Sequence, residues 1–358
     1  MTEENLFSET GWIITDKDLP PKREEKKYLK DLSTSAEKYL SKPLKTMGGA
    51  EPEKQESVKP KMEKDKEKEK DKKKDKQLRV MIIGAHPDDA DYLCGGLALL
   101  LTREGHRVKF VAVTNGDIGH QLKSPEELAF IRSREALNSA KALGAEYECL
   151  GVHDGHVFVN EENTRKVVKV IREFAPDLII THRPYDYHRD HRYTGQLVMD
   201  ASYMLIVPHY FLEFPPQTRE MPVICYAFDK FKKPYPFRID VLLNIDDIYE
   251  EKIKALANHE SQFFEWLPWT IQMEGIVNEE TDLDKRLELV GMVLNNTFGP
   301  ITEKYLEFLK TVFPNKKNVS YEAYEICEYG KQPKKSELKK LFPGAYFVKE
   351  GELDKYGN

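Results

Sequence analysis

The stretch that decides the fold is VMIIGAHPDDADYLCGGLALLL, residues 80–101. Its first four residues are apolar and predict a buried parallel strand, because strands covered on both faces carry continuous apolar residues. The run breaks at Gly84, and His86, Asp88 and Asp89 follow directly. In an open α/β sheet, ligands bind beyond the carboxyl ends of the strands. Since a histidine and two carboxylates are costly to desolvate without a partner, we expect a metal site there.

Composition limits the classes of protein to consider. The 358 residues are 40% hydrophobic and 32% charged, which allows one large or two ordinary domains. No run of about 18 apolar residues occurs, so we expect no membrane span. The acidic first residues lack the basic and apolar regions of a secretion signal, and we therefore expect none. A net charge of -6 argues against nucleic acid as the main partner.

The cysteines indicate the cellular compartment. They are widely separated and form no C-x-x-C pair, which is typical of reduced residues in a cytoplasmic protein. The four are Cys94, Cys149, Cys225 and Cys327. We therefore expect a cytoplasmic localisation.

Three regions are expected along the chain. Residues 51–76 are dominated by Lys, Glu, Asp and Pro and have no apolar face to bury. We therefore interpret residues 1–76 as a disordered N-terminal tail and charged linker. A folded domain is expected over residues 77–300, and residues 301–358 are expected to be a C-terminal extension.

Apolar runs alternate with helical periodicity through the folded domain. Strands are expected at 79–84, 108–114, 147–151, 178–181, 222–228 and 241–245. Helices are expected at 89–104, 125–143, 160–174, from about 190, and at 248–259. This alternation predicts an α/β protein with a doubly wound, mostly parallel sheet.

A second polar cluster, HRPYDYHRDH at residues 182–191, follows the fourth expected strand. It should lie at the same sheet edge as the first cluster. Catalytic zinc uses three protein ligands and leaves one position for water. His86 and Asp89 can reach one ion, and either His188 or His191 would complete the set. Alone, H-P-D-D is typical of a turn or a helix cap and H-x-D-H of a polar loop, but two such clusters at one edge favour a metal site.

Both clusters resemble the signatures of a known family. The family motif A-H-P-D-D-E stands here as residues 85–90 and H-x-D-H as residues 188–191. Over residues 79–262 the chain resembles the LmbE-like, or PIG-L, N-acetylglucosamine deacetylases. The resemblance implies a Rossmann-like three-layer α/β/α fold with a mostly parallel sheet, and makes residues 77–300 a deacetylase domain. It also implies zinc (Zn2+) as the cofactor.

The same resemblance assigns roles to the polar side chains. His86, Asp89 and His191 would be the zinc ligands. Asp88 would be the general base that takes a proton from water. His188 would donate to the oxyanion that develops on the amide carbonyl.

Three further roles follow from the resemblance. Asp190 would orient the His188 imidazole. Arg132 and Asp154 would contact sugar hydroxyls through directional hydrogen bonds. The alternative for Arg132 is a helix-surface ion pair with Glu135.

One residue departs from the family pattern, because Ala90 stands where the family usually has Glu. The alanine side chain offers neither a charge nor a hydrogen bond, so any substrate contact of that Glu is missing or moved to Asp91.

The sequence predicts a zinc-dependent N-deacetylase that releases acetate from an N-acetylglucosamine-type sugar or glycoconjugate. We expect this small-molecule substrate to be the binding partner and expect no binding of nucleic acid. The protein could also form a homo-oligomer. Two alternatives remain: a zinc amidase for a thiol conjugate or another acylated amine, and a weakly active or non-catalytic glycan-binding homologue.

Overall fold

The computed structural model describes residues 76–277 and 281–356. Contacts between Cα atoms divide the chain into Met1–Lys74 and Asp75–Asn358, and all described residues belong to the second unit. The tail and linker expected at residues 1–76 therefore lie almost wholly outside the described residues. None of the described helices combines the length and apolar character needed to cross a bilayer.

The described residues build an eight-stranded sheet in the order β3-β2-β1-β4-β5-β7-β6-β8. The first five strands in this order are parallel, and the last three pair antiparallel. The strands are β1 (Arg79–Gly84), β2 (Arg107–Thr114), β3 (Glu146–Val152), β4 (Leu178–Thr181), β5 (Val223–Ala227), β6 (Val241–Asn244), β7 (Tyr321–Ile326) and β8 (Tyr346–Phe347). The expected α/β fold with a mostly parallel sheet is confirmed.

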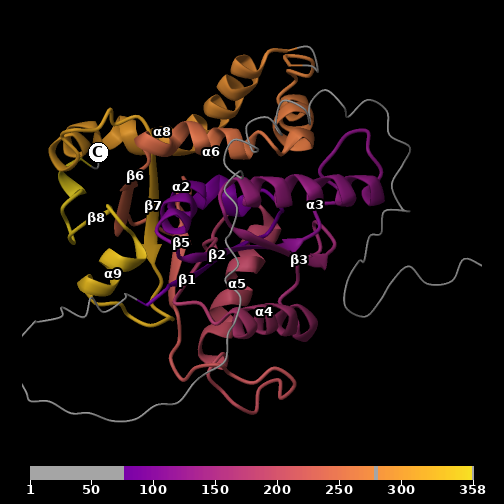
Figure 1. Cartoon of the computed structure of the whole chain (residues 1–358), viewed down its shortest axis with the longest axis vertical. Helices are drawn as coiled ribbons and strands as arrows, with labels where there is room; N and C mark the ends of the chain where they lie inside the picture. Colours follow the sequence, from indigo (N-terminus) through magenta and orange to yellow (C-terminus); the bar gives the residue numbers. More distant parts are fainter. Residues whose placement is uncertain (1–75, 278–280, 357–358) are drawn as a thin grey trace, which may run out of the picture. The chain divides into compact units, whose positions relative to one another are not determined.

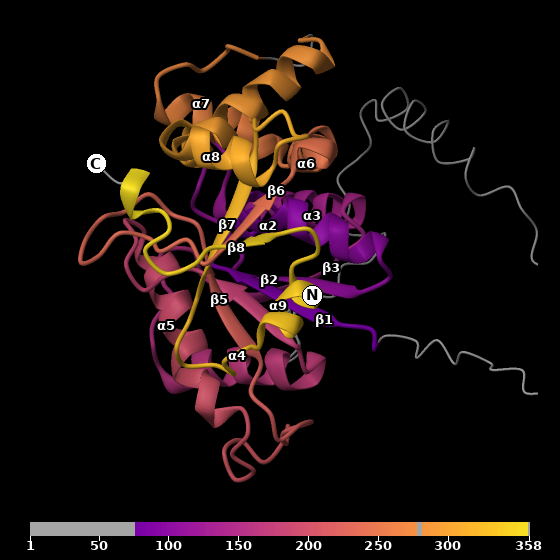
Figure 2. The same cartoon turned by 90° about the vertical axis from the view of Figure 1, so that its left-hand side faces the viewer.

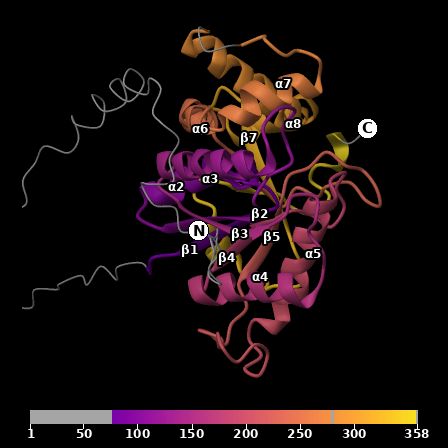
Figure 3. The same ribbon diagram turned by 90° about the vertical axis from the view of Figure 1, so that its right-hand side faces the viewer.

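Helices cover both faces of this sheet (Figure 1, Figure 2 and Figure 3). The α-helices are α2 (Asp89–Arg103), α3 (Pro125–Ala142), α4 (Glu161–Phe174), α5 (Arg189–Met204), α6 (Tyr249–Leu256), α7 (Leu267–Thr270), α8 (Leu283–Val312) and α9 (Lys335–Leu341). Short segments are the 3-10 helices η1 (Asp246–Ile248) and η3 (Asp354–Tyr356) and the π-helix η2 (Ser261–Trp266). One hydrophobic core lies between the sheet and the helices α2 and α3. A second lies between the opposite face of the sheet and the helices α4 and α5.

Strand β1 shows why a continuous apolar run was needed. Val80 and Ile82 pack into the core with α2 and α3, whereas Met81 and Ile83 pack into the core with α4 and α5. Each of these side chains is essentially buried. Full burial of such a side chain contributes about 1.5–3 kcal/mol, so both helical layers hold β1 in register.

The strand order reverses direction next to β1. The chain moves from β1 outward through β2 to β3, then returns to β4 on the other side of β1 and continues to β5. Parallel pairing of β1 with β4 places their carboxyl ends side by side. Such a switch point is the usual ligand-binding crevice of an open α/β sheet. Residues 85–89 and 182–191 both leave the sheet at this point.

Residues 301–358, expected as an extension, contribute β7 to the sheet between β5 and β6. On β7, Glu322 is fully buried and accepts hydrogen bonds from the backbone N–H groups of Gly96 and Leu97. It also forms a 2.7 Å ion pair with the buried Lys252 of α6. We propose that the folded domain extends through these C-terminal residues.

Candidate metal centre

The turn after β1 is tied together by Asp89. Its Oδ2 accepts hydrogen bonds from the backbone N–H groups of Ala85 (2.8 Å) and His86 (2.7 Å). Gly84 makes this possible, because a Cβ there would lie 2.5 Å from the Cβ of Asp89. Asp88 occupies the N-cap of α2, but its side chain forms no capping hydrogen bond. The helix-cap alternative therefore does not hold for Asp88, whereas Asp89 does stabilise the turn.

The second loop presents its histidines through the start of α5. Asp186 Oδ1 accepts from the backbone N–H of His188 at 2.8 Å. His188 is the N-cap of α5, and its Nδ1 accepts from the backbone N–H of Asp190 at 3.2 Å. His191 lies in the first turn of this helix.

Close packing of α5 depends on Gly195. A Cβ at this residue would lie 2.4 Å from the carbonyl oxygen of His182. We expect Gly195→Ala to lower the free energy of unfolding by about 1–3 kcal/mol, the usual cost of forcing extra atoms into a packed interior. Chemical denaturation measures this change.

The matched control is Gly291→Ala in α8, where an added Cβ meets only ordinary contacts of 3.4 and 3.5 Å. We expect that variant to be neutral or slightly stabilised, because alanine favours a helix more than glycine does. Equal stabilities for the two variants would contradict the close approach at Gly195.

Three side chains from the two loops converge. His86 Nδ1 lies 3.2 Å from His191 Nε2. Asp89 places Oδ1 3.5 Å from His191 Nε2 and Oδ2 3.5 Å from His86 Nδ1. Two ligands held tetrahedrally at zinc distances are about 3.3 Å apart. The donor types of His86, Asp89 and His191 are those of a zinc site, and the spacing fits pair by pair, with Oδ1 of Asp89 facing His191 and Oδ2 facing His86.

The opposite ring nitrogen of each histidine meets a carboxylate. His86 Nε2 lies 3.2 Å from Asp154 Oδ1, and His191 Nδ1 lies 3.2 Å from Asp186 Oδ1. Metal-binding histidines commonly donate their second N–H to a carboxylate, which fixes the ring and its tautomer. This arrangement leaves His86 Nδ1 and His191 Nε2 as the acceptor atoms that face each other.

The carboxylates favour positive charge at this place. Burial alone would raise the pKa of Asp89, but the charges of His191 and His182 hold it well below its usual value. Burial opposes protonation of His86, yet hydrogen bonds to Asp154, Asp190 and Asp89 raise its pKa well above the usual value. A divalent cation would satisfy the same carboxylates.

His182 is a neighbour of the centre to which the sequence assigned no role. Its Nε2 lies 3.1 Å from Asp89 Oδ2, and its ring stacks on that of His191 at a centroid distance of 4.1 Å. Asp186, which contacts His191, was likewise given no role.

Several sets of side chains could hold an ion. Among the described residues, three groups bring ligand atoms close enough to share one: His86, His188 and His191; Asp89, His182 and His191; and His86, Asp154 and Asp190.

Arg132 is 3% exposed and faces the first loop. It donates from Nη2 to Asp88 Oδ1 at 2.8 Å and from Nη1 to the Gly116 carbonyl at 3.1 Å. The surface ion pair with Glu135 is not the arrangement found, since Glu135 accepts from Ser261. Arg132 thus holds the Asp88 carboxylate, and its contact with a sugar hydroxyl stays a prediction.

Asp190 and Asp154 are both buried behind the centre. Asp190 accepts from the backbone N–H groups of Gly155 (2.6 Å) and Val157 (3.2 Å). Its link to His188 runs through its own backbone N–H rather than through its carboxylate. Asp154 is 4% exposed and bound to His86, so its expected sugar contact also stays a prediction.

The surroundings of His188 determine which of its ring nitrogens can donate a hydrogen bond. Burial and the charges of His86 and His191 lower the pKa of His188, which favours the neutral ring. Because Nδ1 accepts from a backbone N–H, the single proton of a neutral ring belongs on Nε2. Nε2 is therefore the donor that His188 can offer to a ligand.

Comparison with known proteins identifies the family. A family model, PIG-L: GlcNAc-PI de-N-acetylase, matches residues 81–202, which contain both polar clusters. A diacetylchitobiose deacetylase of Thermococcus kodakarensis is 30% identical over 199 residues, covering 53% of this chain and 73% of that protein. The chain belongs to the PIG-L family. The resemblance seen in the two motifs is confirmed.

Two further likenesses of this PIG-L-family protein are informative. A probable N-acetyl-alpha-D-glucosaminyl L-malate deacetylase 2 of Bacillus cereus is 29% identical over 193 residues, covering 51% of this chain and 83% of that protein. The structure of a 4-carboxy-2-hydroxymuconate hydratase from Pseudomonas putida matches with a TM-score of 0.54 and 16% identity, covering 72% of this chain and 99% of that one. The second likeness shows a shared fold alone.

The departure from the PIG-L motif at Ala90 is accommodated by packing. Ala90 lies in the core with Cys94 and Leu97. The neighbouring Asp91 is buried and lies 2.7 Å from His259 Nε2, and it also accepts from Ser139. Asp91 is therefore held inside the protein and is not placed to take over a substrate contact.

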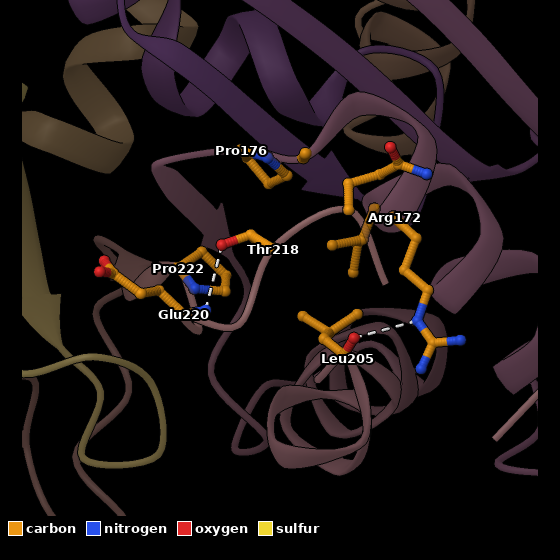
Figure 4. Close-up of a pocket in the computed structure, with 9 residues that line it drawn as sticks. Arg172, Pro176, Leu205, Thr218, Glu220 and Pro222 are labelled. Atoms are coloured by element: carbon orange, nitrogen blue, oxygen red, sulfur yellow. Dashed lines mark hydrogen bonds between the residues drawn. The ribbon is translucent and has the colours of Figure 1, made fainter. Parts of the chain in front are cut away.

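Two cavities of this PIG-L-family protein lie elsewhere. Figure 4 shows a cavity of about 20 Å³ beside Arg172, Leu205 and Pro222. A groove of about 850 Å³ runs along Tyr305 of α8 and the C-terminal residues 348–354. Neither is lined by a residue of the metal centre, so the site is defined by its convergent polar groups.

Proposed function

We propose that this protein is a zinc-dependent hydrolase that removes the acetyl group from an N-acetylated amino sugar or its glycoconjugate. The relatives named above support deacetylation of N-acetylglucosamine-type substrates. The observation that carries the proposal is the Asp88 carboxylate, which directly precedes Asp89 in the chain and is held by Arg132 rather than by the three converging donors. A hydrolase of this kind needs such a base, whereas a purely structural metal site does not.

Zinc would be held by His86, Asp89 and His191. When bound, it would polarise a carbonyl oxygen and lower the pKa of a water molecule. The protein supplies the remaining steps through its own side chains.

Asp88 would move protons. Its carboxylate is partly exposed and is fixed by the 2.8 Å contact with Arg132. It would accept a proton from the attacking water and return it to the departing amine. Its side chain does not cap α2, and the carboxylate is directed toward Arg132 instead.

His188 would stabilise the developing oxyanion. Its Nε2–H can donate because Nδ1 is occupied by the backbone N–H of Asp190. Donors that are already oriented toward the position of developing charge commonly contribute more to catalysis than those that must reorganise.

A substrate panel tests the proposal. Purified protein supplied with zinc is assayed for acetate and free amine with N-acetylglucosaminides, with acylated thiol conjugates and with simple acylated amines. Acetate release from the sugars supports the proposal. Turnover of thiol conjugates or simple amines alone would establish the amidase alternative, and zinc binding without any turnover would establish the non-catalytic one.

We also propose that the protein acts in the cytoplasm. Its four cysteines are free in the structure, and Cys94, Cys225 and Cys327 are buried. Such residues are typical of a reducing compartment.

A further inference from the structure

The loop that follows β5 leaves the sheet beside the metal centre. Strand β5 pairs parallel with β4, so residues 228–237 emerge at the same edge as residues 182–191. The loop has the sequence DKFKKPY at residues 229–235, named here the basic loop. No role follows for it from the proposed chemistry.

A buried arginine fastens the basic loop to the loop of the metal centre. Arg183, which directly follows His182, is 1% exposed. It donates from Nε to Asp229 Oδ2 at 2.6 Å, and to the carbonyl oxygens of Phe231 and Tyr235 at 3.1 Å each. Burying a guanidinium is costly unless its donors are satisfied, and here the basic loop satisfies them. The basic loop is therefore held in one place.

Arg183 brings together an aromatic rim composed of Tyr185, Tyr187, Phe231 and Tyr235. Tyr187 is 74% exposed, and its ring centroid lies 5.7 Å from that of His188 and 5.9 Å from that of His191. It lies 6.0 Å from Phe231, and Tyr185 lies 5.4 Å from Tyr235. The rim therefore continues outward from the metal centre, where a group attached to the substrate sugar would lie.

The charges around this rim are positive. Lys230, Lys232 and Lys233 are exposed, and none forms an ion pair within the described part of the chain. The nearby carboxylates are engaged, Asp229 by Arg183 and Asp186 by His191.

Two arginines lie on α5, and Arg192 is the one that contacts the aromatic rim, through Tyr187. Arg192 donates to the carbonyl oxygens of Asp186 and Tyr187. Arg189 donates to the carbonyl of Gly155 and lies over the Phe158 ring. Within residues 76–277 and 281–356, neither has a carboxylate partner.

We propose that the basic loop and the aromatic rim form a subsite for a negatively charged group, a phosphate ester or a carboxylate, attached to the amino sugar. This inference rests on the deacetylase function proposed above. Fixed positive charge beside an aromatic surface selects an anionic substituent over a neutral one, because the uncompensated lysines gain a partner only from the former.

The test compares charged and neutral substrates. Steady-state kinetics of the zinc-loaded protein are measured with N-acetylglucosamine 1-phosphate, with an N-acetylglucosaminide of a hydroxy acid, and with methyl N-acetylglucosaminide. In the triple variant Lys230→Gln/Lys232→Gln/Lys233→Gln, we expect KM for an anionic substrate to rise about tenfold at low salt, the size expected for three exposed charge contacts. The kcat and the KM for the neutral glycoside should stay within about twofold. The shift should shrink at about 0.5 M salt, where screening is stronger.

The control variant Lys141→Gln/Lys169→Gln/Lys339→Gln removes the same charge from exposed lysines on α3, α4 and α9 and should leave every KM unchanged. A shift with only one anionic substrate would identify phosphate or carboxylate as the ligand. Equal effects on charged and neutral substrates, or no effect, would overturn the inference.

A failure of the proposed deacetylase function can be distinguished from a failure of the subsite. If the wild type released acetate from no sugar, calorimetric binding of N-acetylglucosamine 1-phosphate would test the subsite alone. Weaker binding to the triple lysine variant than to the wild type would still support the subsite, and equal or absent binding would overturn it.

Discussion

Asp88→Ala should abolish most turnover while the protein keeps its metal. Loss of a general acid–base group commonly costs about 10²–10⁴-fold in rate, and we expect a fall in kcat in this range. Metal content should be unchanged, because Asp88 contacts Arg132 and not the three converging donors. The measurement pairs kcat for acetate release with metal analysis of the same sample.

Two further variants make this result specific. Asp88→Asn keeps the shape of the side chain without its basicity, so it should lose activity to a similar extent. Asp200→Ala removes an exposed aspartate from α5 and should keep full activity. A fully active Asp88→Ala protein would show that another group is the base.

His191→Ala should remove the metal itself. His191 Nε2 is the atom nearest to both partners of the proposed set, 3.2 Å from His86 Nδ1 and 3.5 Å from Asp89 Oδ1. Loss of an outer partner of a metal ligand costs roughly 10–100-fold in affinity, and removal of a ligand should exceed that. Zinc affinity is measured by competition with a chelator.

His188→Ala is the decisive companion variant, since His188 also lies within reach of His86 and His191. We expect it to retain zinc and to lose rate through loss of the oxyanion donor. His209→Ala, at an exposed histidine, should change neither property. If His188→Ala lost the metal and Asp89→Ala kept it, the three-histidine set would replace the proposed one.

The parallel half of the fold was predictable from the sequence. Continuous apolar runs separated by helical periodicity indicated β1 to β5, and Ser124-Pro125 indicated the start of α3, where Ser124 accepts from the N–H of Glu127. Strand β7 was not predicted. Its Glu322 is typical of an exposed position, yet it is buried because Lys252 and two backbone N–H groups satisfy it. Those partners are distant in sequence, so no local pattern indicates them.

The part of the site that lies at the ends of neighbouring strands was predictable from the sequence. Two polar clusters after neighbouring strand ends indicated a shared site, and the structure brings His86, Asp89 and His191 together. Their assignment as ligands stays a prediction.

The outer contacts of the site were not predictable. Asp154, expected at the sugar, lies behind His86, and Arg132, also expected there, holds Asp88. Side-chain direction within a loop decides such contacts, and sequence spacing carries no information on it. The family motif could have prompted attention to Asp186, since it lies two residues before His188, but its bond to His191 depends on the fold.

The central claim is that two loops converge on one divalent ion. The most direct test is a crystal structure of the zinc-loaded protein with anomalous diffraction recorded at the zinc absorption edge. We predict a peak at about 2.0–2.2 Å from His86 Nδ1, a carboxylate oxygen of Asp89 and His191 Nε2. A peak instead among His86 Nε2, Asp154 and Asp190, or no peak near these loops, would contradict it.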